Sequence, residues 1–358
     1  MAWLLYGAYG YTGELIARRA LDKGDEPPIL AGRREAPLRA LAEELGLEWR
    51  AFPLGGTPDR RADHLEGVDA VLHVAGPFSQ TSAPMVRACL ARGAHYLDVT
   101  GEVDVFEAVF ARDEEARQAG VTLLPGVGFD VVPSDCLAAA LASRLPEACR
   151  LELAIYSESQ ETSQGTAKSM LEGVSQGGRV RRRGRLERVS FGHATRVVAF
   201  PPGRRRCVAI PWGDLSTAYR STGIEEITTY MAQPALAIAG TRLANLAAPI
   251  LSLGPVQRRL NRWIERNVSG PSESTRERAQ THVWGRVEDR WGVALEGSVT
   301  TPEAYRFTAD SALACLERVR AGDAPAGAQT PSLAFGAEFV TGLEDVCWRL
   351  PAARLASE

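Results

Sequence analysis

The first third of the chain alternates short apolar runs with longer segments of helical periodicity, and this alternation limits the folds open to it. Residues 2–6 are apolar throughout, as expected of a strand buried on both faces, and residues 11–24 carry apolar positions at helical spacing. The same cycle recurs up to residue 124. Strands separated by helices form parallel sheets through right-handed crossovers. We therefore predict an α/β fold with a doubly wound parallel sheet of the Rossmann type, which binds ligands at the carboxyl ends of its strands.

The sequence GAYGYTG, residues 7–13, stands between the first predicted strand and the first predicted helix. Its glycines follow the spacing G-x-x-G-x-x-G, a variant of the dinucleotide fingerprint G-x-G-x-x-G. Glycines there permit a tight turn and a close approach to a pyrophosphate, and the N–H groups at the helix N-terminus favour an anion. This setting favours a phosphate-binding turn over a purely structural one. The predicted cofactor contacts in it are Gly7, Tyr9, Gly10, Tyr11, Thr12 and Gly13.

The second predicted strand ends in LAGRR, where an NAD site would place an acid for the ribose hydroxyls. Arg33 and Arg34 stand there instead. A guanidinium suits the 2′-phosphate of NADP because it donates two N–H groups and stacks on adenine. The alternative is a pair of solvated arginines, since only two of the 41 basic residues, Lys23 and Lys168, are lysines. We predict NADP as the cofactor.

The composition excludes several other classes of function. A net charge of -3 gives no general attraction to nucleic acid. The six cysteines form no C-x-x-C pair and have no histidines at metal-binding spacing, so we predict no metal site and reduced thiols in a cytoplasmic protein. The first residues show no signal peptide. Neither a G-x-S-x-G elbow nor an H-E-x-x-H motif is present.

After Pro146 the pattern changes to alternating segments typical of a mixed or antiparallel sheet. We therefore predict a dinucleotide-binding Rossmann domain over residues 1–135 and a second α+β domain over residues 136–325. The C-terminal segment 326–358 could return to the first domain.

Five side chains are candidates for chemistry beside the cofactor: Asp130, Ser134, Asp135, Glu102 and Lys168. The leading three are Asp130, Ser134 and Lys168. Asp130 follows the sixth predicted strand in GFDVVPSD, and Ser134 belongs to the same motif. Lys168 lies in GTAKSMLEG of the second domain, after Thr166, which we predict to be a helix N-cap. Each has a structural alternative: Asp130 accepts backbone N–H bonds, Ser134 caps a helix, and Lys168 is an exposed lysine in a first helical turn.

Three later segments raise the question of lipid contact. The basic run 177–188 predicts a solvated hairpin, with contact to anionic lipid or an acyl carrier as the alternative. Residues 231–253 are apolar, but Arg242 and Asn245 interrupt them, which favours two packed helices over a membrane span. Residues 254–267 predict a basic amphipathic helix with one apolar face, made of Leu260, Trp263 and Ile264. We expect no transmembrane span, and peripheral membrane contact stays open.

Together with VAGPF, DVTGE and PGVGFDVVPSD, the motifs GAYGYTG and LAGRR resemble the saccharopine dehydrogenase-like NADP-binding oxidoreductases, in particular the branch of the trans-acting enoyl reductases. The resemblance continues through GTAKSMLEG and TPSLAFGAEFV. It implies a second domain on a mixed sheet and a homodimer through that sheet. It further implies that Ala75, Gly76 and Pro77 approach the central ribose, and that Thr100, Gly101, Gly128 and Phe129 approach the nicotinamide.

Three functions are compatible with these features. The leading one is hydride transfer from NADPH to an apolar, unsaturated small molecule, acyl or polyketide-derived. The second is a saccharopine-type dehydrogenase of a secondary amine or amino acid. The third is a non-catalytic NADP-binding module at a lipid or protein surface.

Overall fold

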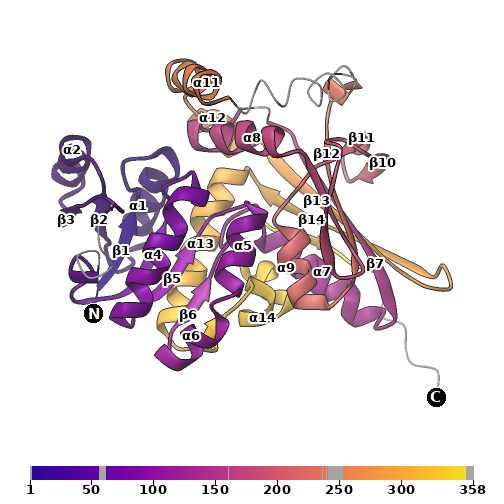
Figure 1. The fold of residues 1–358 in the computed structure, drawn as a ribbon, viewed down its shortest axis with the longest axis horizontal. Coiled ribbons are helices and arrows are strands. Elements are labelled where there is room, and N and C mark those ends of the chain that lie inside the picture. Colours follow the sequence, from indigo (N-terminus) through magenta and orange to yellow (C-terminus); the bar gives the residue numbers. More distant parts are fainter. Residues whose placement is uncertain are drawn as a thin grey trace. The chain divides into compact units, whose positions relative to one another are not determined.

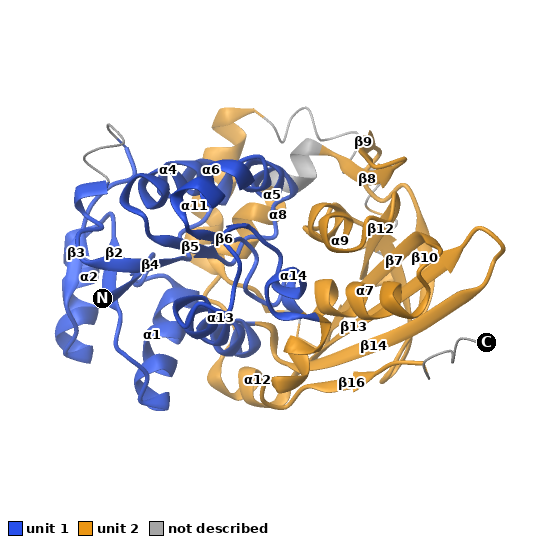
Figure 2. Ribbon diagram, turned by 90° about the horizontal axis from the view of Figure 1, so that it is seen from below, with its two compact units in different colours: residues 1–132, 305–336 blue, residues 133–304, 337–358 orange. Residues whose placement is uncertain are grey.

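The computed structural model describes residues 2–55, 62–159, 161–235, 237–238, 240 and 253–351. The chain divides into two compact units, coloured separately in Figure 2. Residues 1–132 and 305–336 form the first, and residues 133–304 and 337–358 form the second. Each unit is built on its own sheet, and Figure 1 labels the elements.

The first unit contains a seven-stranded sheet in the order β15-β6-β5-β4-β1-β2-β3, and every pairing in it is parallel. The order β3-β2-β1-β4-β5-β6 is that of the Rossmann fold, so the predicted fold class is confirmed. The strands are β1 (Ala2–Tyr6), β2 (Ile29–Gly32), β3 (Trp49–Ala51), β4 (Val68–His73), β5 (His95–Asp98), β6 (Thr122–Leu124) and β15 (Gly327–Ala328).

Helices cover both faces of this sheet. In Figure 2, α4, α5 and α6 lie on one side of it, and α1 and α13 lie on the other. Four of the helices end at glycines in the left-handed conformation, where the chain turns back towards the sheet. The helices are α1 (Tyr11–Lys23), α2 (Glu35–Leu45), α4 (Phe78–Arg92), α5 (Val103–Phe110), α6 (Asp113–Ala119), α13 (Ala304–Arg320) and α14 (Pro331–Phe335).

Helix α13 comes from late in the sequence and is tied into the first unit by ion pairs. Asp310 is buried and lies 2.7 Å from Arg19 Nε, on α1. Arg320 makes two hydrogen bonds to Asp69, of 2.9 and 3.0 Å. Strand β15 follows and pairs with β6 at the sheet edge.

These contacts change the expected domain limits. We expected residues 136–325 in the second domain, whereas residues 305–336 belong to the first unit because α13 and β15 pack there. We expected residues 326–358 to return to the first domain, whereas those after Gly336 belong to the second unit. There β16 (Cys347–Arg349) pairs with β14.

The second unit contains a nine-stranded mixed sheet in which β7 and β12 are parallel and the other pairings are antiparallel. Its strands besides β16 are β7 (Ala148–Ser157), β8 (Gly178–Arg182), β9 (Arg185–Val189), β10 (Thr195–Phe200), β11 (Gly203–Ala209), β12 (Glu226–Ala232), β13 (Gln280–Asp289) and β14 (Ala294–Pro302). Its helices are α7 (Val132–Arg144), α8 (Gln164–Gln176), α9 (Asp214–Thr222), α11 (Gly254–Asn267), α12 (Glu273–Arg278) and the 3-10 helix η1 (Ala337–Gly342).

Helix α7 lies close to the sheet of the second unit over a pair of glycines. Gly285 and Gly297 are cross-strand partners on β13 and β14. A Cβ at Gly285 would stand 3.0 Å from the side chain of Leu137, and a Cβ at Gly297 would stand 3.2 Å from it. The absence of side chains at these two positions therefore sets how near the helix can approach.

The basic run forms the expected hairpin, β8 and β9, but one of its arginines is not solvated. Arg181 is buried, donates to the carbonyl oxygens of Leu215 and Gly184, and stacks on the ring of Tyr219. A charged side chain is stable in such a place only when its N–H groups are paired.

Residues 231–253 were expected to form two packed helices, and residues 254–267 a basic amphipathic helix. Within residues 231–253, positions 236, 239 and 241–252 lie outside the described residues. Helix α11 forms as predicted, but Ile264 is buried while the side chain of Trp263 is 60% exposed, so the two do not share one buried face. No helix in the described parts of the chain is long and apolar enough to cross a membrane.

The contact of α13 with the first unit through Arg320 and Asp69 leads to a stability prediction. Lysine at position 320 cannot reproduce the two parallel bonds from Arg320 to Asp69, so Arg320→Lys should lower the free energy of unfolding by about 1–2 kcal/mol. The control is Arg39→Lys, because Arg39 is exposed and stands 3.9 Å from each of its acidic neighbours. It should change stability by less than about 0.5 kcal/mol. Urea denaturation measures both, and equal effects would contradict this role of Arg320.

Candidate functional site

The turn between β1 and α1 has the geometry that its glycines predict. Gly7, with φ of 97°, donates its N–H to the carbonyl of Ala31 over 2.8 Å. A Cβ at Gly13 would stand 2.3 Å from the carbonyl oxygen of Gly7, so no side chain fits there. Gly10 is the N-cap of α1 and has no side chain to bond the first turn. The helix N-terminus is thus built like an anion-binding site.

The aromatic residues of this turn lie on its two sides. The Tyr9 ring packs over the end of β2, where a Cβ at Gly32 would stand 2.5 Å from Tyr9 Cε1. Tyr11 contacts the ring of Tyr305 edge-on, with 5.0 Å between centroids. Thr12 is half-buried in the first turn of the helix.

Arg33 and Arg34 follow β2 directly and are both exposed. The Arg34 guanidinium lies over the Tyr9 ring, 5.1 Å from its centroid. Neither guanidinium has an acidic partner among the described residues. Both are therefore free to meet an anion at the end of β2, as the 2′-phosphate of NADP requires.

The turn after β4 meets the glycine turn at the point where the strand order reverses. A Cβ at Gly7 would stand 2.8 Å from the backbone nitrogen of Ala75, so the two turns touch backbone to backbone. In a doubly wound sheet, ligands bind at this switch point. The structure thus brings Ala75, and with it Gly76 and Pro77, to the predicted pyrophosphate turn.

Two side chains fix the turn that contains Ala75 and Pro77. The Thr81 hydroxyl lies 2.6 Å from the Ala75 carbonyl oxygen and 3.0 Å from that of Pro77. Thr81 Oγ1 lies 3.0 Å from Nε2 of His73, which is fully buried. Burial lowers the pKa of His73 to about 3, so the imidazole is neutral. Because the hydroxyl proton is directed at the carbonyls, Nε2–H is the donor to Thr81.

The start of helix α4 is fixed by a carboxylate from the next loop. Glu102 accepts hydrogen bonds from the backbone N–H groups of Phe78, over 3.0 Å, and Ser79, over 2.8 Å. These groups belong to the first turn of the helix, where a carboxylate is favoured. Glu102, one of the candidates for chemistry in the sequence, therefore has a structural task at this helix start.

A buried carboxylate holds the loops that follow β5 and β6. Asp98 accepts hydrogen bonds from the Tyr96 hydroxyl at 2.6 Å and from the N–H groups of Thr100 and Gly126 at 3.0 Å each. Burial raises its pKa to about 6, while these three donors favour the charged form. Thr100 is consequently buried and fixed beside Gly101.

The predicted nicotinamide loops lie against each other and against α13. A Cβ at Gly101 would stand 2.7 Å from Asp130 Oδ2, so this carboxyl packs on the Gly101 backbone. Phe129 donates its N–H to Thr308 Oγ1 over 3.0 Å, and a Cβ at Gly128 would stand 2.9 Å from the Thr308 methyl. Burial raises the pKa of Asp130 to about 7. Asp130 can therefore exchange a proton near neutral pH.

Ser134 and Lys168 belong to the second unit. Ser134 is buried as the third residue of α7, inside the helix and not at its N-cap. Lys168 forms an ion pair with Glu265, with 2.7 Å between Nζ and Oε1. The N-cap of α8 is Ser163, whose hydroxyl accepts from the N–H of Thr166 over 3.2 Å, so the capping role predicted for Thr166 moves three residues upstream.

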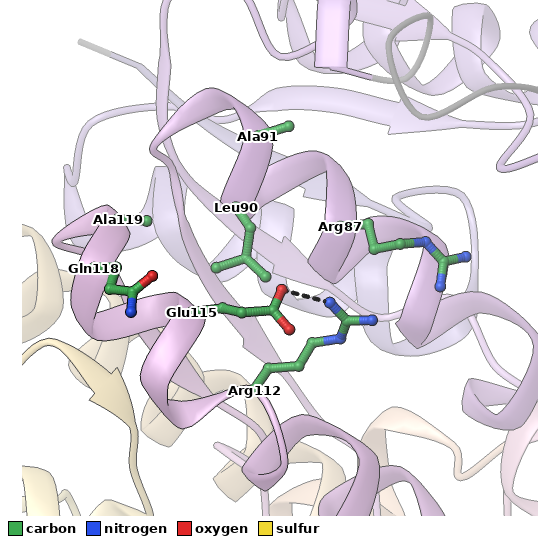
Figure 3. Close-up of a pocket in the computed structure, with 7 residues that line it drawn as sticks. All are labelled: Arg87, Leu90, Ala91, Arg112, Glu115, Gln118 and Ala119. Atoms are coloured by element: carbon green, nitrogen blue, oxygen red, sulfur yellow. Dashed lines mark hydrogen bonds and ion pairs between the residues drawn. The ribbon is translucent and has the colours of Figure 1, made fainter.

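A pocket on the first unit lies away from these residues (Figure 3). Residues of α4 and α6 line it together with Arg112, which precedes α6, and Arg112 and Glu115 form an ion pair of 2.7 Å. None of the predicted cofactor or catalytic residues is among those that line it: Arg87, Leu90, Ala91, Arg112, Glu115, Gln118 and Ala119.

Sequence reasoning missed the residues that support the site from behind. Asp98 is the first residue of the motif DVTGE and the last residue of β5. An acidic residue at the end of a buried strand is a signal that could have identified it as a supporting residue of the site. Thr81 carries no motif. Thr308 lies 179 residues after Phe129, a separation that no local pattern bridges.

Comparison with known proteins agrees with this geometry. Residues 3–124 match the family Saccharopine dehydrogenase NADP binding domain. A trans-acting enoyl reductase of Mycobacterium leprae is 31% identical over 173 residues, which cover 45% of this chain and 41% of that protein. A trans-acting enoyl reductase of Mycobacterium tuberculosis H37Rv is 28% identical over 225 residues, which cover 58% of this chain and 48% of that protein. The chain thus spans less than half the length of these relatives.

Solved structures extend the likeness of fold to both units. The apo saccharopine dehydrogenase (L-Glu forming) of Saccharomyces cerevisiae aligns with a TM-score of 0.63 at 10% identity, covering 98% of each chain. The homospermidine synthase of Legionella pneumophila, in complex with NAD, aligns with a TM-score of 0.61 at 12% identity, covering 95% of this chain and 88% of that one. The predicted resemblance and the predicted cofactor are confirmed: residues 3–124 match a saccharopine dehydrogenase NADP-binding domain, and the chain has the fold of saccharopine dehydrogenase.

Proposed function

We propose that this protein is an NADP-dependent oxidoreductase that reduces a carbon–carbon double bond in an apolar, acyl-type or polyketide-derived small molecule. The observation that carries the cofactor part is the backbone contact of Gly7 with Ala75 at the switch point of the sheet, beside the N-terminus of α1. The names of the enoyl reductases, which resemble about half of the chain, support the reaction class.

The residues around this contact fit the parts of a dinucleotide. The glycine turn would hold the pyrophosphate on backbone N–H groups, and Arg33 and Arg34 would bind the 2′-phosphate. Ala75, Gly76 and Pro77 would pack on the central ribose, and the loops of Thr100, Gly101, Gly128 and Phe129 would contact the nicotinamide. When bound, the cofactor supplies a hydride, and these residues orient it.

Asp130 is the best-supported candidate for proton transfer. It packs on Gly101 in the predicted nicotinamide loops, and its pKa of about 7 keeps a fraction of the carboxyl protonated at neutral pH. Such a group could protonate the carbon or oxygen on which negative charge develops after hydride transfer. Ser134 and Lys168 remain proposals for polar contacts to the substrate from the second unit.

The first test of the reaction class is NADPH consumption against enoyl thioesters, enones and imines formed in situ. Turnover of enoyl substrates supports the proposal, and turnover of imines alone would favour a saccharopine-type dehydrogenase of an amine or amino acid. Tight NADPH binding without turnover would favour a non-catalytic binding module. We further propose a cytoplasmic homodimer, which light scattering and cell fractionation would test.

Cofactor preference should depend on the arginines after β2. Arg33→Ala removes a guanidinium that has no acidic partner among the described residues, so the folded protein should keep its stability. The Kd for NADPH should rise by about tenfold or more, because a charge-assisted contact to phosphate contributes about 1.5–3 kcal/mol. The Kd for NADH, measured by the same fluorescence titration, should stay within about twofold. An equal loss of affinity for NADPH and NADH would refute the proposal that Arg33 binds the 2′-phosphate.

The Thr81 hydroxyl should matter for cofactor affinity although it lies behind the turn. Thr81→Val keeps the shape but leaves Nε2–H of His73 and the Ala75 carbonyl without this partner. We expect a stability loss of about 1–3 kcal/mol and a several-fold weaker Kd for NADPH. Thr81→Ser retains the hydroxyl and is the control. If valine and serine bind NADPH equally well, the turn is not held in this way.

The raised pKa of Asp130 predicts a pH-dependent stability. The folded state keeps a proton that the unfolded state releases above about pH 4. This stabilising contribution is therefore complete below pH 4 and is lost as the pH rises through about 7. The melting temperature of the wild type, relative to Asp130→Asn, should fall between pH 4 and pH 8. Asp22→Asn, at an exposed position on α1, is the control. If the melting temperatures of the wild type and of Asp130→Asn change with pH in the same way, Asp130 does not titrate between pH 4 and pH 8.

A further inference from the structure

Helix α11 of the second unit is attached to its neighbour α8 by one face only. Ile264 is the buried residue of the helix. At its C-terminal end, the Glu265 carbonyl accepts a hydrogen bond from Gln164 over 3.1 Å, and the Glu265 carboxylate pairs with Lys168. Val256, Gln257, Leu260 and Asn261 are half-buried, and the exposed residues of the helix lie on its other side.

The open surface of α11 carries four arginines and no acidic partner for them. Arg258, Arg259, Arg262 and Arg266 are all exposed, and none forms an ion pair within the described residues. Their spacing along the helix, i, i+1, i+4 and i+8, gathers them on one side. The whole chain has a net charge of -3, so this positive patch is local and does not reflect a generally basic protein.

Two large apolar side chains stand exposed beside these arginines. Trp263 is 60% exposed and is a helical neighbour of Arg259 and Arg266, at i−4 and i+3. Leu253, the N-cap residue of the same helix, is 53% exposed. The sequence pattern predicted Trp263 beside Ile264 on one apolar face, but Ile264 is buried and Trp263 is not, so packing within this unit does not account for the indole.

We propose that this face of α11, defined by Leu253, Arg258, Arg259, Arg262, Trp263 and Arg266, binds the surface of an anionic phospholipid membrane. The arginines would pair with lipid phosphates, and the indole would enter the headgroup region, where tryptophan is favoured. A basic helix with exposed apolar side chains is typical of such interfacial contacts. An acidic protein or a nucleic acid would satisfy the charges, but a second exposed apolar side chain on the same helix, Leu253 at its N-terminal end, favours a lipid surface. This inference is independent of the cofactor and of the reaction.

The test is co-sedimentation of the full chain with vesicles of phosphatidylcholine alone or with 30% phosphatidylserine, a composition chosen at about that of an acidic leaflet. Binding is expected only to the mixed vesicles, and it should weaken as salt is raised. The variant Arg258→Gln, Arg259→Gln, Arg262→Gln, Arg266→Gln should bind at least about tenfold more weakly, because each arginine near an anionic surface contributes about fivefold. Trp263→Ala should reduce binding several-fold, and its effect should persist at higher salt.

The matched control removes four exposed arginines from the hairpins of the same unit, in the variant Arg185→Gln, Arg188→Gln, Arg204→Gln, Arg206→Gln. It has the same net charge as the α11 variant and should bind vesicles nearly as the wild type does. Melting temperature and NADPH titration verify that all variants are folded. The proposal is overturned if the wild type does not bind mixed vesicles, if the control loses as much binding as the α11 variant, or if single-stranded RNA binds through α11 while vesicles do not.

Discussion

The site depends on one close contact between two backbones. Gly7 follows β1 and Ala75 follows β4, and the space between them admits no side chain at position 7. Because the chain leaves these neighbouring strands towards opposite faces of the sheet, an opening forms at their carboxyl ends. A pyrophosphate can enter there only if the turn is narrow and its N–H groups face outward. The glycines at positions 7, 10 and 13 meet both requirements.

The other loops of this edge are held by buried polar groups and by a distant helix. Asp98 gathers the loops after β5 and β6 through two backbone N–H groups, and Thr81 fixes the carbonyls of the β4 turn. Thr308 of α13 supports the loop that carries Asp130. Unpaired polar groups at these buried positions would be costly, so the network specifies a single loop arrangement. These hydrogen bonds join the loops of this edge to one another and to α13.

Much of the first unit could be predicted from the sequence, because its information is local. The apolar strands, the helical periodicity and the glycine spacing each act over fewer than about 20 residues, and they predicted the parallel sheet, the turn at Gly7 and the arginines after β2. The return of α13 could not be predicted, since its partners Asp69 and Arg19 lie hundreds of residues away and carry no pattern. The same holds for Thr308. Trp263 was predicted to share one apolar face with Ile264, but only Ile264 is buried, because helical spacing shows which residues share a face and not which face meets the protein.

We propose that four loops at one sheet edge form the cofactor site. Hydrogen exchange measured with and without NADPH tests this most directly, because it reports backbone protection along the whole chain. We expect slower exchange in peptides covering residues 7–14, 74–81, 98–102 and 126–131, and unchanged exchange in residues 87–91 and 112–119, the segments that line the pocket of Figure 3. Protection confined to that pocket, or no protection in the glycine turn under saturating NADPH, would contradict it.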